Sequence, residues 1–94
     1  MIAATRDPDG RRVVLTRERW AHIRDEHATL SPKQREIMAA VRVPYLSMRG
    51  RSEDEVWFFA EDAGRFPWLQ VVVHYEGGEG WVVTAFPRTA LPRR

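Results

Sequence analysis

The sequence predicts an α+β domain consisting of a short N-terminal strand, two helices and a four-stranded antiparallel sheet. Two helix-start signals precede Pro44, whereas after it short β-branched and aromatic runs alternate with turns rich in glycine and proline. Helices followed by a run of strands are typical of the α+β class. The chain has 94 residues, of which 44% are hydrophobic, and this suffices for one core. We therefore expect a single domain over residues 1–94.

The N-terminal half begins with a turn and a strand and continues with two helices. Thr16 can cap a helix by accepting a hydrogen bond from its first turn, where Glu18 also matches the helix dipole. Ser31 followed by Pro32 is a second start signal, because proline is tolerated at the first helical position. The expected elements are a turn at residues 7–10, a strand at 12–15, and helices over 17–28 and 32–43.

The C-terminal half reads as strands at residues 45–48, 56–59, 68–75 and 81–86, with a glycine-rich hairpin at 76–80. Strict alternation along the last strand places Thr84 on the same face as Val82 and Phe86. The helices are expected to bury one face of the sheet. The opposite face is then half-open and is the place to look for function.

Composition excludes several classes of protein. The chain has no cysteine, which rules out a disulfide-stapled scaffold, a thiolate metal site and a cysteine nucleophile. It has no apolar run of about 18 residues, the length that a membrane-spanning helix needs, and its first residues lack the apolar core of a signal peptide. We therefore expect a cytoplasmic protein without a membrane partner.

Two histidines on the first helix are candidates for chemistry. His22 and His27 are five residues apart, so they project from different sides of a helix and do not form the metal-binding pair of a zinc protease. We therefore expect no metal site. His27 falls on the face of Trp20 and Ile23, which should meet the sheet, and it can serve as a general acid or base. The alternative is structural, with His27 a dipole partner at the helix end and His22 a solvated residue.

Basic and aromatic residues are a second group of candidates. The chain carries fourteen arginines but one lysine, with a net charge of +2. Arginine forms bidentate contacts with phosphate, and interleaved aromatic rings can stack on bases of single-stranded RNA. Each arginine taken singly also fits an ordinary solvated surface. The candidate substrate-binding residues are Arg49, Arg51, Arg65, Arg88, Tyr45 and His74.

The order of these motifs resembles a known nuclease group. Val14-Leu15-Thr16, then Arg19-Trp20-Ala21-His22-Ile23 with His27, and finally Val83-Thr84-Ala85-Phe86-Pro87 are similar to the phage-associated branch of the barnase–EndoU–colicin–RelE superfamily. The resemblance covers about residues 13–87 and implies a metal-independent endoribonuclease without a cofactor. Many members are toxins. Cleavage by the ribose 2′-hydroxyl leaves a 2′,3′-cyclic phosphate.

The resemblance also implies roles for individual residues. His27 is the expected acid or base, with His22 as a second such group or a helix-fixing residue, and Thr84 positions the phosphate. Our own inference from loop placement adds Arg51 or Arg49 as the group that stabilises developing charge. RNA is the expected partner, an antitoxin or immunity protein is a further candidate, and an exposed strand edge allows a homodimer.

Two other functions fit the same sequence. A domain of this fold can bind RNA or protein without cleaving it, since arginines and aromatic rings suffice for binding. A small interaction domain is the third reading, and it requires a large exposed apolar patch. One structural observation tests the three interpretations of function. It is whether His22, His27, Thr84 and an arginine converge on one concave surface.

Overall fold

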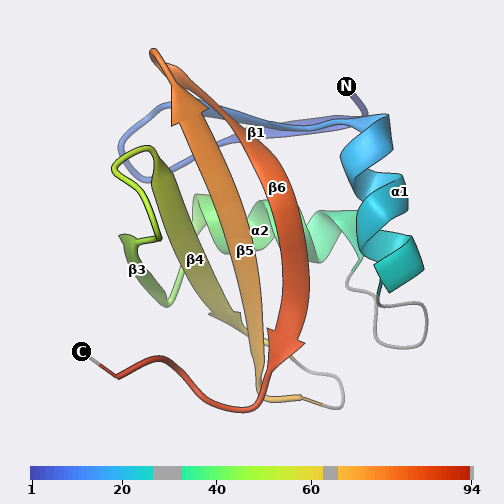
Figure 1. Cartoon of the computed structure of the whole chain (residues 1–94), viewed down its shortest axis with the longest axis vertical. Coiled ribbons are helices and arrows are strands. Elements are labelled where there is room, and N and C mark those ends of the chain that lie inside the picture. Colours follow the sequence, from blue (N-terminus) through green and yellow to red (C-terminus); the bar gives the residue numbers. More distant parts are fainter. Residues whose placement is uncertain (27–32, 63–65, 94) are drawn as a thin grey trace.

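The chain folds into a six-stranded mixed sheet with two helices (Figure 1). The computed structural model describes residues 1–26, 33–62 and 66–93. Within these ranges the strands are β1 (Ala3–Arg6), β2 (Arg12–Leu15), β3 (Leu46–Arg49), β4 (Glu55–Glu61), β5 (Trp68–Glu76) and β6 (Glu79–Arg88), and the helices are α1 (Arg17–Glu26) and α2 (Gln34–Arg42). The predicted α+β class is confirmed.

The predicted four-stranded sheet is wrong in its extent. The strand order is β1-β2-β6-β5-β4-β3, in which β2 and β6 are parallel and the other neighbours are antiparallel. The expected meander of β3 to β6 is present, but β1 and β2 extend it beyond β6. β1 was missed because Ala3-Ala4-Thr5-Arg6 has no apolar alternation of its own. It forms a strand because it pairs with β2, and no local sequence pattern predicts that pairing.

The helix ends follow from local hydrogen bonds. The expected cap at Thr16 is confirmed, because its Oγ1 accepts a hydrogen bond from the Arg19 N–H at 3.2 Å. α2 follows Lys33, whose N–H donates to Glu36 Oε1 at 2.9 Å. Its end at the C-cap Val43 agrees with the prediction. The predicted start signal at residues 31–32 lies outside the described residues.

Both helices pack against the same sheet. α2 lies behind the sheet in Figure 1 and contacts β1, β4 and β5, while α1 contacts β6. α2 contributes Ile37, Ala40 and Val41 to the core, and α1 contributes Ile23, all four almost completely buried. Burial of each of the isoleucine and valine side chains stabilises the fold by about 1.5–3 kcal/mol. Neither helix in the described part of the chain has the length and apolar character needed to cross a membrane.

The face of the sheet opposite α2 is the open face. Alternation along β5 turns Val71 and Val73 into the core, so Gln70 and Val72 point to the open face. A β-bulge in β6 changes the expected alternation, because Val72 pairs with Thr84 whereas Val73 pairs with Val82. Our prediction that Thr84 and Val82 share a face is therefore wrong. Val82 is fully buried in the core, and Thr84 reaches the open face.

Candidate functional site

The open face carries a shallow hollow over strands β4, β5 and β6. Its volume is about 360 Å³. It combines two guanidinium groups, a carboxylate, an amide and a hydroxyl with apolar and aromatic side chains, which is the mixture expected of a ligand site. The lining residues are Arg51, Glu55, Trp57, Gln70, Val72, Val83, Thr84, Phe86 and Arg88.

Glu55 is held at the rim of the hollow by two donors. Its Oε2 accepts hydrogen bonds from the Arg51 backbone N–H and from Trp57 Nε1, both at 2.9 Å. Gly50 makes this arrangement possible, since a Cβ there would clash with the Glu55 side chain and lie 2.7 Å from Trp57 Nε1. One carboxylate oxygen is fixed by these bonds, and Glu55 lines both this hollow and the one beside the β1–β2 turn.

Two of the polar side chains in the hollow are available to a ligand. Within the described part of the chain, neither the Arg51 guanidinium nor the Thr84 hydroxyl is hydrogen-bonded to another group of the protein. Arg88 is oriented by its Nη1, which donates to the Oε1 of the buried Gln70 at 2.8 Å. These residues come from three different segments and converge only in the folded sheet.

Aromatic pairs lie on either side of the hollow along β5. His74 contacts Trp81 with ring centroids 4.8 Å apart, and Tyr45 contacts Trp68 with centroids 5.0 Å apart. Trp68 and His74 share the open face with Gln70 and Val72 by strand alternation. His74 is also the register partner of Glu55 on β4. The predicted substrate-binding residues Tyr45, His74 and Arg88 therefore share one face with Thr84 and Arg51.

Other predicted site residues lie elsewhere. The Nε2 of His22 contacts the Glu26 carboxylate on α1, and His22 does not line the hollow, so its placement contradicts the expected convergence. Arg49 lines a separate hollow beside the β1–β2 turn, together with its register partner on β4, Val56, which packs against the core. His27 and Arg65 lie outside the described residues. The convergence test is met by Thr84 and Arg51, and it fails for His22.

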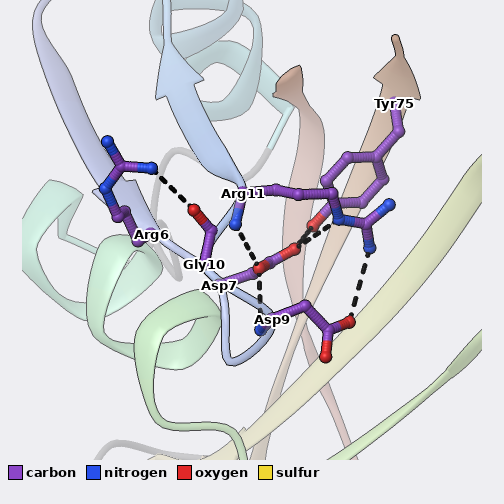
Figure 2. Close-up of polar contacts among 6 residues, drawn as sticks. All are labelled: Arg6, Asp7, Asp9, Gly10, Arg11 and Tyr75. Carbon is purple, nitrogen blue, oxygen red and sulfur yellow. Dashed lines mark hydrogen bonds and ion pairs between the residues drawn. The ribbon is translucent and has the colours of Figure 1, made fainter. Parts of the chain in front are cut away.

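A second polar cluster lies at the β1–β2 turn and is shown in Figure 2. The Asp7 side chain is 1% exposed and accepts four hydrogen bonds. The donors are the backbone N–H groups of Asp9 and Arg11, Arg11 Nε at 3.1 Å and the Tyr75 hydroxyl at 2.6 Å. The Arg11 guanidinium also lies 3.8 Å from the centre of the Tyr75 ring. These contacts tie the turn to β5.

The titration of this cluster follows from its contacts. Burial by itself raises the pKa of Asp7, but the hydrogen bonds from Tyr75 and the backbone, together with the charge of Arg11, lower it below its ordinary value of 3.8. Burial and the neighbouring carboxylate raise the pKa of Tyr75 above its ordinary value of 10.0. Asp7 is therefore ionised and Tyr75 protonated at neutral pH. With every acceptor engaged, this cluster stabilises the fold and is not the candidate site.

Sequence reasoning missed the three other side chains of the hollow that carry polar groups, namely Glu55, Trp57 and Gln70. Glu55 begins a strand and reads as an ordinary solvated residue. A glutamine inside the apolar run of β5 was the available signal, since a buried amide needs a hydrogen-bond partner. In the described segments, no group of three or more histidine, aspartate or glutamate side chains could hold a metal ion.

Comparison with known proteins adds no assignment. No family model matches the chain, and neither a curated protein nor a solved structure matches it. The resemblance to the nuclease superfamily consequently stays a prediction from short motifs.

Proposed function

We propose that this protein is a metal-independent endoribonuclease whose single-stranded RNA substrate lies across the open face. The observation that carries the proposal is the meeting of Thr84, Arg51 and Arg88 with the Glu55 carboxylate in one hollow. RNA transesterification needs a base, an acid and donors for the phosphate oxygens. The hollow supplies the base and the donors, and the acid is a histidine.

Glu55 is the proposed general base. In the reaction, the base removes the proton of a ribose 2′-hydroxyl, whose oxygen attacks the adjacent phosphorus while the bond to the 5′-oxygen breaks. Glu55 is the one acidic side chain that lines the hollow among the described residues. The hydrogen bonds to its Oε2 from Arg51 and Trp57 hold it in a fixed orientation. A base held in place in this way pays little entropy to reach its substrate.

Thr84, Arg51 and Arg88 are the proposed phosphate ligands. The Thr84 hydroxyl can donate to a non-bridging oxygen, and a guanidinium can donate two parallel hydrogen bonds to a phosphate. Charge on these oxygens rises in the transition state, so donors placed beforehand accelerate the step. Gln70 would keep Arg88 oriented without contacting substrate, through the 2.8 Å hydrogen bond that Arg88 donates.

The departing 5′-oxygen needs a proton, and two imidazoles are candidates to donate it. His74 lies on the open face opposite Glu55 in the β4–β5 register. His27 is the residue that the motif resemblance proposes, and its position is not described. Matched His74→Ala and His27→Ala variants decide between them, because loss of the acid lowers the rate about 10²–10⁴-fold.

The decisive experiment is incubation of the purified protein with single-stranded RNA in the presence of EDTA. We expect fragments ending in a 2′,3′-cyclic phosphate. Thr84→Val, which removes only the hydroxyl, should lower the cleavage rate by about 10²–10³-fold. Thr5→Val on the edge strand β1 is the matched control and should leave the rate unchanged. Absence of cleavage by the folded wild-type protein, or equal rates for the two variants, overturns the proposal.

RNA binding without cleavage is the second candidate function. It is favoured by the position of His22, which is paired with Glu26 away from the hollow. In that case RNA affinity falls with rising salt and with Arg51→Ala, while no product forms and Glu55→Gln does not weaken binding. An antitoxin or a second copy of the chain as partner stays a prediction, and the sheet edges at β1 and β3 are where a copy would pair.

A further inference from the structure

We infer that Tyr45 and Trp68 form a base-stacking subsite for a nucleotide next to the one whose phosphate occupies the hollow. The inference depends on the proposed RNA substrate and specifies how it is held. Tyr45 is 66% exposed, an unusual exposure for a large aromatic side chain. Its ring meets that of Trp68 at an interplanar angle of 47°, so the two rings do not cover one another face to face.

The position of Trp68 in the sheet connects this pair to the hollow. Trp68 lies on β5 two residues before Gln70, which lines the hollow, and on the same face. Adjacent same-face positions on a strand are about 6.6 Å apart. A base on the ring pair would therefore belong to a neighbouring nucleotide of the same strand.

The charges on either side of Trp68 determine how a nucleotide would be oriented in the subsite. Its register partner on β6 is Arg88, and its register partner on β4 is Glu61. A phosphate is attracted to the Arg88 side and repelled from the Glu61 side. Tyr45 lies on the Glu61 side, since its N–H donates to the carbonyl of Phe59 on β4 at 2.8 Å. The base then stacks toward β4 while its phosphate points to β6, and this charge pattern selects a nucleotide over an uncharged aromatic ligand.

Single-stranded RNA is the ligand that these features fit. Stacking on aromatic rings needs a base that is not already paired, and the adjacent guanidinium matches the backbone charge. A duplex presents its backbone but hides the flat faces of its bases. The subsite is expected to accept any base, because every base has a flat face for stacking.

The test measures binding without cleavage. A fluorescent tetranucleotide RNA with 2′-O-methyl riboses has no 2′-hydroxyl to react, so its Kd can be measured by anisotropy whether or not the protein is a nuclease. Tyr45→Ala should weaken binding about tenfold, and Tyr45→Phe should retain wild-type affinity. Val43→Ala, also at an exposed apolar position but beside α2, should have no effect.

Tetranucleotides that lack one base, at each position in turn, identify the stacked nucleotide. We expect one abasic ligand to bind the wild-type protein about tenfold more weakly than the intact ligand. Its affinity should not fall further with Tyr45→Ala, because the missing base and the missing ring belong to the same stacking contact. Equal losses with every abasic ligand, or no loss with Tyr45→Ala, overturn the subsite even if the enzyme cleaves RNA. Coupling without cleavage supports the subsite and rejects the nuclease. Absence of any RNA binding rejects both.

Discussion

The Asp7 cluster and the open-face hollow contain the same residue types but differ in how many of their polar groups are hydrogen-bonded within the protein. Both contain a carboxylate, an arginine and an aromatic donor. The Asp7 side chain is 1% exposed and is surrounded by four hydrogen-bond donors. Glu55 is half-buried and its two donors share one oxygen. In the described segments, neither the Arg51 guanidinium nor the Thr84 hydroxyl, which line the same hollow, has a hydrogen-bond partner. A saturated cluster stabilises a fold, whereas an unsaturated one can bind a ligand.

The largest expected effect on stability comes from removing the buried carboxylate of Asp7. Asp7→Ala should lower the free energy of unfolding by about 3–5 kcal/mol, because it leaves Arg11 and the Tyr75 hydroxyl without their partner. Asp9→Ala in the same turn is the control. Its side chain is 81% exposed, and the expected loss is below about 0.5 kcal/mol. Urea unfolding measures both, and similar losses would show that the cluster is not the structural element we describe.

Gly50→Ala tests whether the position of Glu55 in the hollow matters for cleavage. The added methyl group displaces Glu55 and Trp57, so we expect cleavage to fall about tenfold with a stability loss of about 1 kcal/mol. Gly78→Ala is the matched control, since nothing lies within 4 Å of a Cβ there. Cleavage kinetics measure the rate of each variant, and urea unfolding measures its stability. If the Gly50→Ala variant cleaved RNA as fast as the Gly78→Ala variant, Glu55 would not be the proposed general base.

Acid should weaken the saturated cluster. The pKa of Asp7 is lower in the folded state than its ordinary value of 3.8, so its contribution to stability is complete above that pH. It is lost as the pH falls through the lowered folded-state pKa. Unfolding free energies of wild type and Asp7→Asn should therefore differ more at about pH 5 than at about pH 2. A difference that grows on acidification would contradict this assignment.

The smallest expected effect concerns the unpaired arginine. Arg51→Ala removes a guanidinium with no partner in the described segments, so the fold should keep its wild-type stability. RNA affinity should fall, and the slope of log K against log salt should decrease by about one. Arg35→Ala on the exposed surface of α2 is the control. Equal slopes for the two variants would show that Arg51 does not contact phosphate.

The elements with local signals were predicted well, and the candidate site was predicted in part. Thr16 capped its helix as expected, and α2 ended at Val43. Arg51 and Arg88 were selected from their chemistry and Thr84 from the motif resemblance, and the fold places all three in one hollow. Glu55 was missed because nothing local separates it from a solvated glutamate, and what places it is its bond to Trp57 and the space left by Gly50.

The sequence by itself determined the α+β class, the β3 to β6 order and the candidate phosphate ligands, because side-chain period, caps and turn residues act over a few neighbouring positions. Tertiary structure alone decided the parallel pairing of β2 with β6, the bulge that turns Thr84 to the open face, and the position of His22 away from the hollow. Each of these depends on contacts between distant segments. Such contacts form when a shared core is buried, and no short stretch of sequence encodes them.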